Sequence, residues 1–287
     1  MSFQITEAFV QQYNSTVSLV SQQKQSRLEP AVRVETIRGT REAFDSIGTV
    51  EAQPRGGRHA DTPQMDTPHM RRWVTSAPYN WADLVDKPDR LRMLYDPTSP
   101  YVQNAVMAFN RAKDKIIINA AFAPVWTGEH GDVQKTFPTS NIIPHGDTGL
   151  TIEKLIQARG MLWRNEIDES EPLFAAVTSF QLEDMLNNTK VQSADYNTIK
   201  ALVRGEINSF MGFTFIRTEQ LEKDGTTRKC IVWSKPGLLL AKAEDITTKI
   251  SERDDKNYST QVYAEMDLGA VRMEDEKVLQ LQCKEGA

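Results

Sequence analysis

The chain has 287 residues, 39% of them hydrophobic and 25% charged, which is enough for a sizeable core in one large or two small domains. The formal net charge of −5 argues against a protein that condenses nucleic acid, because such binding needs clustered Lys and Arg. A local basic face is still compatible with this charge.

The first quarter of the chain is predicted to hold one helix followed by extended segments. Residues 3–24 carry apolar side chains at roughly helical spacing among Gln and Ser, which predicts an amphipathic helix that needs a partner surface. Residues 28–50 change to extended chain broken at glycines, and residues 73–75 form a plausible returning strand. A stretch this long with few apolar anchors is either a functional arm or disordered.

Helices are predicted in the next segment. Short helices are expected at residues 80–85 and 89–94. The strongest local pattern follows at residues 100–120, where apolar residues recur every three to four positions. Ser99 can cap this helix and Pro100 suits the first helical position. A helix of this length is ~30 Å long, as long as a small domain is wide, and suggests a central spine.

The remainder of the chain mixes short helices with strands. Residues 122–148 are rich in Gly, Pro, Thr and His and predict a long loop or a weak hairpin. Thr151 caps a helix at 152–163, with Leu155, Ile156 and Leu162 pointing inward. A buried strand in "EPLFAAVTS" precedes short helices in "SFQLEDMLNN" and "SADYNTIKALVRG". Strands are then expected at 213–216, 229–233, 238–241, 246–250, 261–270 and 278–283. The pattern as a whole is α+β.

Catalytic and cofactor motifs are hard to find. The sequence has no G-x-G-x-x-G, P-loop, G-x-S-x-G or H-E-x-x-H pattern. "GEHGD" (128–132) and "PHGDTG" (144–149) place His beside Asp on glycine-rich turns, which could bind a metal or supply a base, but ordinary loops have the same composition. His59 and His69 are ten residues apart, which is not a recognised ligand spacing. "EIDESE" (166–171) favours a solvated turn, with a divalent-ion site as the alternative.

The two cysteines, Cys230 and Cys283, lie in apolar alternating runs and favour buried free thiols in a reducing cytosol over a disulfide. The first residues lack the basic start and apolar stretch of a signal peptide. No segment approaches ~20 consecutive apolar residues, so no membrane span is expected.

Arginine placement indicates an interface. Arginine far outnumbers lysine in residues 28–111, and aromatic residues are interleaved with it around residues 73–81. Arginine and aromatic side chains are common interface anchors, whereas nearby aspartates offset the positive charge that nucleic acid would need. The candidate contacts to a neighbouring subunit are Arg33, Arg38, Arg41, Arg58, Arg71, Arg72, Trp73 and Trp81.

The order of these segments resembles the major capsid proteins of tailed double-stranded DNA bacteriophages, with their Hong Kong 97-type fold. The likeness is carried by "WADLVDKPDRLRMLYDPTSPYVQNAVMAFNRAKDKIIINA", "LIQARGMLW", "EPLFAAVTSFQLEDMLNN", "GEINSFMGFTFIRTEQL", "CIVWSKPGLLLAKAEDITTKISERDDKN" and "MDLGAVRMEDEKVLQLQCKE". It extends along nearly the whole chain through the order and spacing of many weak motifs.

The resemblance implies a division of the chain. It comprises an N-terminal helix and arm at 1–45, an extended two-stranded loop at 46–80, a peripheral domain at 81–147 and 236–287 with the spine helix at 100–120, and an axial domain at 148–235. In some family members a lysine and an asparagine on neighbouring subunits form a covalent bond. Residues 46–80 contain no lysine, so no such cross-link is expected from this loop.

The function implied is that of a non-enzymatic coat protein without a cofactor. It would be made in the bacterial host cytoplasm and would assemble with itself into hexamers and pentamers of an icosahedral head. Scaffold, portal and decoration proteins would be further partners, and packaged DNA would be contacted non-specifically.

Two alternatives stay open. One is an encapsulin-like compartment shell, and the other is a small metal-dependent hydrolase using His130, Asp132, His145 and Asp147. If the extended loop clamps neighbours, deleting residues 55–72 should leave a folded subunit that builds no stable particles.

Overall fold

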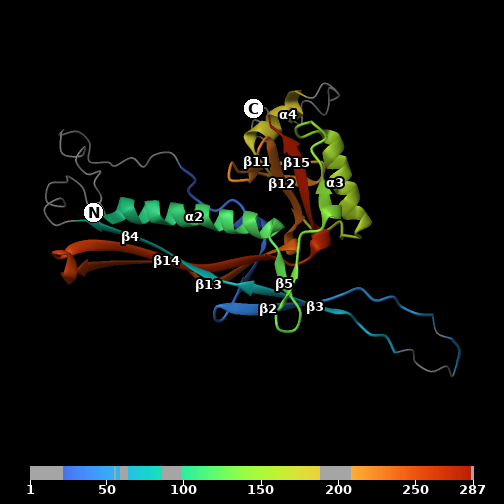
Figure 1. Ribbon diagram of the computed structural model, residues 1–287, viewed down its shortest axis with the longest axis horizontal. Helices are drawn as coiled ribbons and strands as arrows, with labels where there is room; N and C mark the ends of the chain where they lie inside the picture. Colours follow the sequence, from blue (N-terminus) through green and yellow to red (C-terminus); the bar gives the residue numbers. More distant parts are fainter. Residues whose placement is uncertain (1–21, 55, 59–63, 86–97, 188–207, 286–287) are drawn as a thin grey trace.

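Residues 22–54, 56–58, 64–85, 98–187 and 208–285 are described by the computed structural model of the protein. Within them, three α-helices and three β-sheets form an elongated body with a compact domain at one end and a projecting two-stranded loop (Figure 1). The α+β class expected from the sequence is confirmed. Short 3₁₀ turns connect the elements at Glu29–Ala31, Thr139–Asn141, Lys235–Gly237, Asp254–Lys256 and Asp275–Lys277.

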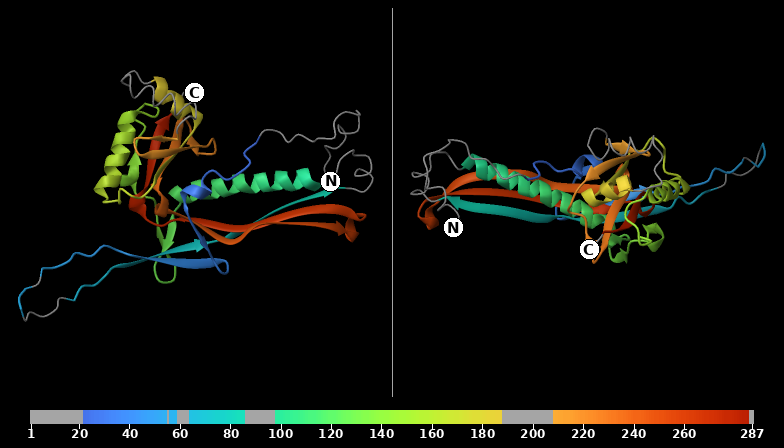
Figure 2. Two further views of the ribbon diagram at one scale, coloured as in Figure 1. Left: turned by 180° about the vertical axis from the view of Figure 1, so that it is seen from behind. Right: turned by 90° about the horizontal axis from the view of Figure 1, so that it is seen from above.

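The elongated part is a helix lying along a four-stranded sheet. The strand order is β1 (Arg33–Thr36), β13 (Leu238–Arg253), β14 (Ser259–Arg272) and β4 (Ala77–Val85), with only the β1–β13 pair parallel. Helix α2 (Thr98–Phe122) runs along this sheet in both views of Figure 2. Ala105 and Phe109 of the helix pack against Ala264, Met266 and Leu268 of β14. With 25 residues, α2 is about 37 Å long, and it packs against the two central strands, β14 and β13.

Three predictions for this region need correction. Residues 80–85 are not helical, because they form the second half of β4 and pair with β14 from Thr260 to Glu265. Apolar residues at 81, 84 and 85 fit a helical period as well as an edge strand, and only the pairing partner decides between them. The spine helix is confirmed, but it begins at Thr98, so Ser99 is inside its first turn and is not its cap. The two strands expected at 238–241 and 246–250 are one strand, β13, with register shifts near Glu244.

The compact domain is built on a seven-stranded sheet. The strand order is β7 (Ile142–Ile143), β15 (Val278–Lys284), β12 (Thr227–Ser234), β8 (Leu173–Val177), β10 (Phe213–Arg217) and β9 (Ser209–Phe210), and β11 (Lys223–Asp224) pairs with β12. Helices α3 (Ile152–Arg164) and α4 (Ser179–Asn187) lie beside this sheet (Figure 1). The large core here includes Leu155, Leu162 and both cysteines, which are buried free thiols as expected.

Helix α3 matches its prediction closely. The Thr151 side chain accepts a hydrogen bond from the Lys154 backbone N–H, which is the expected N-cap. Leu155 and Leu162 are buried, but Ile156 is 55% exposed, so its expected inward position is wrong. The helix covers the sheet with a narrower face than its three apolar residues suggested.

A third sheet joins two hairpins below the long sheet. Its order is β2 (Arg41–Ile47), β3 (His69–Thr75), β5 (Val125–Thr127) and β6 (Val133–Lys135), all antiparallel. Of the two alternatives for residues 122–148, the hairpin is therefore correct. The extended chain expected at 28–50 and the returning strand at 73–75 are also confirmed.

The segment before β1 is held against α2 by one buried carboxylate. Asp114 is fully buried in the helix and accepts hydrogen bonds from the Ser26 hydroxyl (2.6 Å) and from the backbone N–H groups of Arg27 and Leu28 (3.1 Å each). Leu28 then enters the core of the compact domain. The helix expected at residues 3–24 lies almost wholly outside the described residues, as do the helices expected at 89–94 and 193–205, and the described residues 22–24 are not helical.

Candidate functional site

The two hairpins of the third sheet meet around a half-buried tryptophan. The indole Nε1 of Trp73 donates a hydrogen bond to the Gly128 carbonyl (2.9 Å), and the Arg41 guanidinium lies 4.6 Å from the centre of its ring. Arg41 Nη2 also donates to the Gly131 carbonyl (2.7 Å). Gly128 and Gly131 both have positive φ, at +93° and +70°, which glycine adopts without strain. The "GEHGD" turn is thus a backbone acceptor site for Trp73 and Arg41.

The same sheet carries an exposed ion pair at its edge. Arg71 binds Asp45 with two parallel contacts, Nε to Oδ1 at 2.6 Å and Nη2 to Oδ2 at 2.8 Å. The hydrogen bond from Arg71 lowers the pKa of the Asp45 carboxyl. Asp45 of β2 lies directly opposite Arg71 of β3, so the pair links two strands within one subunit.

Arg72 is the candidate contact whose position differs most from the expectation. Its residue is 4% exposed, and its guanidinium binds the Asp275 carboxylate (2.9 Å) and the Met273 carbonyl (3.2 Å). We therefore remove Arg72 from the candidate contacts to a neighbouring subunit. Trp81 is half-buried in β4 and packs beside the α2–β14 core, so it contributes mainly to the subunit's own packing.

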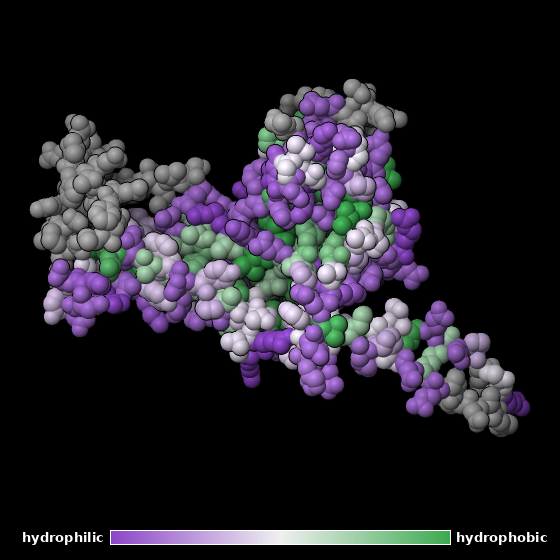
Figure 3. All heavy atoms as spheres, viewed as in Figure 1, coloured by the Kyte–Doolittle hydropathy of each residue, from purple (hydrophilic) through white to green (hydrophobic). Residues whose placement is uncertain are grey.

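The loop between β2 and β3 has no core of its own. It leaves the sheet after Ile47, the Gly48 N–H donates to the Pro68 carbonyl (2.8 Å), and the chain beyond runs out as two extended segments (Figure 1). Hydrophobic residues are interspersed with hydrophilic ones along it (Figure 3). Ile47 is 69% exposed, and other large apolar residues exposed here are Val50, Met65 and Met70. Ile47 and Met70, at the base of the loop, line a cavity together with residues 164–168 of the compact domain, whereas Val50 and Met65 lie on the loop itself.

The remaining candidates lie at the surface. Arg58 is exposed in the loop, and Arg38 is exposed in the turn between β1 and β2. Arg33 in β1 is exposed and pairs with Glu35 (2.8 Å).

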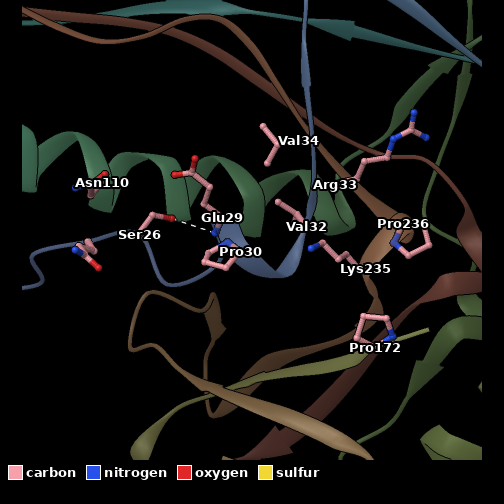
Figure 4. Close-up of a pocket in the computed structure, with 11 residues that line it drawn as sticks. Ser26, Glu29, Pro30, Val32, Arg33, Val34, Asn110, Pro172, Lys235 and Pro236 are labelled. Atoms are coloured by element: carbon pink, nitrogen blue, oxygen red, sulfur yellow. Dashed lines mark hydrogen bonds between the residues drawn. The ribbon is translucent and has the colours of Figure 1, made fainter. Parts of the chain in front are cut away.

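Arg33 also lines a cavity of about 880 Å³ where the segment before β1 passes between α2 and the compact domain (Figure 4). The lining is mostly apolar and includes Pro30, Val34, Pro172 and Pro236. Val34 is 41% exposed here. A second surface with apolar character thus lies well away from the projecting loop.

The four residues of the hydrolase alternative do not form one site. His130 and Asp132 lie in the β5–β6 turn, whereas His145 and Asp147 precede α3 in the compact domain. His145 Nδ1 accepts from the Asp147 N–H (2.9 Å), and a hydrogen bond from Lys284 lowers the pKa of Asp147. In the described part of the chain, no group of three or more His, Cys, Asp or Glu side chains could hold a metal ion.

The other polar turns have structural partners. Lys154 donates through Nζ to the carbonyls of Thr148 (2.8 Å), Gly149 (2.7 Å) and Gln282 (3.1 Å), and burial lowers its pKa. In the "EIDESE" turn, Glu171 pairs with Lys277 (2.9 Å). His69, at the start of β3, is exposed, while His59 lies outside the described residues. None of the helices that the structure describes combines the length and the apolar composition that a bilayer crossing requires.

The predicted interface residues were mainly arginines, whereas the exposed apolar residues of the two hairpins were not predicted. Ile47, Met70, Trp126 and Val133 lie on the two hairpins with at least 42% exposure each. The apolar residues of 41–47 and 69–75 do not follow a period of two, since Ala43 and Phe44 are adjacent and so are Trp73 and Val74, so no periodic signal in the sequence could have found these exposed residues.

Comparisons with known proteins agree with this architecture. The sequence model of a family described as "Phage capsid protein" matches residues 5–285. The fold is similar to the capsid of Ralstonia phage GP4, with a TM-score of 0.79, 11% identity and coverage of 96% of each chain. It is also similar to the capsid of cyanophage P-SCSP1u (0.74, 15% identity, 98% of this chain and 94% of that one) and of cyanophage Pam1 (0.74, 13% identity, 99% of both). No curated protein sequence matches the chain.

Proposed function

The chain belongs to the phage capsid protein family, and we propose that its extended loop joins neighbouring copies within the shell of the phage head. It is a structural protein of the virion capsid, and its copies build that shell together. The proposal concerns how the copies are joined and which residues do it.

The observation that supports the loop as the joint is its exposed apolar surface. Val50 and Met65 are 53% and 37% exposed on the loop, which has no core of its own, and Ile47 and Met70 in the strands at its base are 69% and 46% exposed. Apolar side chains on a projecting segment gain stability only by burial against another surface, and in a shell every subunit has neighbours. The exposed arginines from the candidate set are Arg33, Arg38, Arg41 and Arg58, and they would add polar contacts at the edges.

The proposed arrangement is one of hexamers and pentamers built by a head-to-tail interface between two different faces of the chain. We propose residues 1–45 as an arm, 46–76 as the extended loop with its supporting strands, 77–147 and 236–287 as the peripheral domain, and 148–235 as the axial domain. The boundary expected at residue 80 moves to 76 because β4 is continuous from Ala77 and belongs to the long sheet.

Further parts of the proposal concern partners. Scaffold, portal and decoration proteins and non-specifically contacted DNA are proposed partners, synthesis is proposed in the bacterial host cytoplasm, and no catalytic role is proposed. An encapsulin-like shell would use the same loop between copies. The family match, which names a phage capsid protein, favours the phage head.

The test is to remove the loop without damaging the sheet. Deleting residues 55–72 would also remove half of β3 and the buried Arg72, so the subunit would lose stability for unrelated reasons. Replacing residues 49–67 by an Asn-Gly turn keeps the Gly48–Pro68 hydrogen bond and the whole of β3. We expect a folded chain that builds no closed particles, measured by circular dichroism, size-exclusion chromatography and negative-stain microscopy.

Point variants separate apolar contact from loop length. Val50→Ser with Met65→Ser should reduce particle yield at least tenfold, because two exposed apolar side chains lose their burial on the neighbour. Gln53→Ser with Gln64→Ser is the matched control and should leave the yield unchanged. Normal particles from the loop replacement would show that the loop does not join the copies.

A further inference from the structure

A cluster of three cations around one carboxylate lies beneath the base of the extended loop. The Asp275 side chain is 2% exposed and binds Arg272 Nε through Oδ1 (2.6 Å). Its Oδ2 binds Arg72 Nη2 (2.9 Å) and Lys135 Nζ (2.7 Å). Burial raises the pKa of Asp275, but hydrogen bonds from Lys135 and Arg272 and the charge of Arg72 outweigh it and hold the pKa at about 2. Three positive charges therefore surround a single ionised carboxylate.

Some N–H donors of the cluster have no acceptor within the described residues. Arg272 Nη1 donates to the carbonyls of Ala121 (2.8 Å) and Ala123 (3.1 Å). Arg72 Nη1 and Arg272 Nη2 are buried and have no hydrogen-bond partner among the residues that the structure describes. Both guanidinium groups bind Asp275, but each keeps one buried nitrogen without an acceptor, which costs free energy that an added anion or acceptor would recover.

A cavity of about 600 Å³ lies over this cluster, between the two hairpins of the third sheet. The charged or titratable residues that line it are Asp45, His69, Arg71, Arg72, Glu129 and Lys135. Asp45 is paired with Arg71 through two contacts, and Arg72 and Lys135 share the single Asp275 carboxylate beneath the cavity. Among the described residues, Glu129 is therefore the one carboxylate of the lining that forms no ion pair with a cation. With His69 neutral, and counted together with Arg272 and Asp275 beneath the lining, four cations (Arg71, Arg72, Lys135 and Arg272) stand against three carboxylates (Asp45, Glu129 and Asp275), a formal net charge of +1.

We propose that this cavity binds a small oxyanion, of phosphate or carboxylate chemistry, between Lys135 and Arg72. The Lys135 side chain is 51% exposed, so an anion can reach its ammonium group from solvent, and that group has donors beyond the one used on Asp275. Charge-assisted hydrogen bonds to an oxyanion are the strong ones, and Arg72 Nη1 is the nitrogen left to make one, since Nε and Nη2 already bind Met273 and Asp275. The bound oxyanion joins β3 to β6 at the base of the loop. It stiffens the hairpin pair from which the loop projects.

The experiment is calorimetric titration of inorganic phosphate into the unassembled full-length chain, with ionic strength held constant by chloride. We expect saturable binding of one phosphate per chain. Lys135→Met should weaken the affinity on the order of tenfold, since one charge-assisted hydrogen bond is lost. Glu129→Gln should strengthen it severalfold, because a carboxylate that repels the anion is neutralised.

The control is Lys249→Met, which makes the same charge change at a 73% exposed lysine of β13 outside the cavity. It should leave phosphate affinity unchanged. Absence of saturable binding, or equal weakening by Lys135→Met and Lys249→Met, would overturn the proposal.

The source of the oxyanion follows from repeating the titration on assembled particles. Phosphate binding that persists in particles identifies a free ion as the occupant. Binding that is present in the free chain and lost in particles identifies a carboxylate supplied by a second copy. Both results require the site to exist.

Discussion

Asp114 offers the sharpest test of how the segment before β1 is held. Asp114→Ala removes the acceptor for the Ser26 hydroxyl and for the backbone N–H groups of Arg27 and Leu28. Leu28 is fully buried, so its N–H group is left without a partner away from water. A hydrogen bond to a charged acceptor contributes about 1.5–3 kcal/mol, and an unsatisfied buried donor costs about 1–3 kcal/mol. Because these terms overlap, we expect a loss of about 3–5 kcal/mol in the free energy of unfolding.

Two measurements check this expectation. Urea denaturation of the unassembled chain gives the free energy of unfolding, and hydrogen exchange gives local opening at the amides of residues 27 and 28. Asp114→Asn keeps one oxygen acceptor and should cost about half as much, whereas Lys115→Ala, at an exposed position on the same helix, should change little. Unchanged exchange at Leu28 in the Asp114→Ala chain would refute the reasoning.

Two further predictions concern packing and acidity. Gly269→Ala places a Cβ against the Thr75 backbone carbonyl, which has no room to move, and this variant should lower the melting temperature. Gly160 lies in open space inside α3, so Gly160→Ala should raise the free energy of unfolding by about 0.5–1 kcal/mol. A melting temperature that does not fall for Gly269→Ala would contradict this packing. Asp275 and Glu285 both have a pKa of about 2, below their usual 3.8 and 4.5. Burial raises each pKa, but the hydrogen bonds and charges of the basic partners lower it by more. Each ionised carboxylate stabilises the fold fully above about pH 4.5, and this contribution is lost as the pH falls to about 2. The loss is on the order of 2 kcal/mol per group in the free energy of unfolding, measured by urea denaturation at a series of pH values. Glu285→Gln should flatten this dependence, and an equally steep loss in that variant would count against it.

Local sequence patterns predicted helices and strands well where the apolar residues fit only one type of secondary structure. The three-to-four residue period of the spine led to α2, and Thr151 with the apolar residues after it led to α3. Residues 80–85 failed because Trp81, Leu84 and Val85 fit two periods at once, and pairing with β14 decides for the strand. Ile156 failed for a related reason, since the width of the buried helix face depends on the sheet beneath it.

The candidate site was predicted in its location more than in its residues. A long stretch with few apolar anchors was expected to be a functional arm or disordered, and the described residues between β2 and β3 project from the sheet as two extended segments. Their exposed apolar residues were overlooked in favour of arginines, although Val50 and Met65 are visible in the sequence. Histidine and aspartate in "GEHGD" suggested chemistry, but the turn uses its glycine carbonyls to bind Trp73 and Arg41, which lie far away in the chain.

The sequence by itself determined the α+β class, the long helix, the late strands and the order of segments that resembles phage capsid proteins. Those features depend on side-chain periods over a few residues, which are local. Only the tertiary structure decided which arginines face outward. Arg72 is buried because Asp275 lies 203 residues further along the chain and reaches it through a different element. A charge is inside or outside according to its partner, and partners distant in sequence are brought together only by the fold.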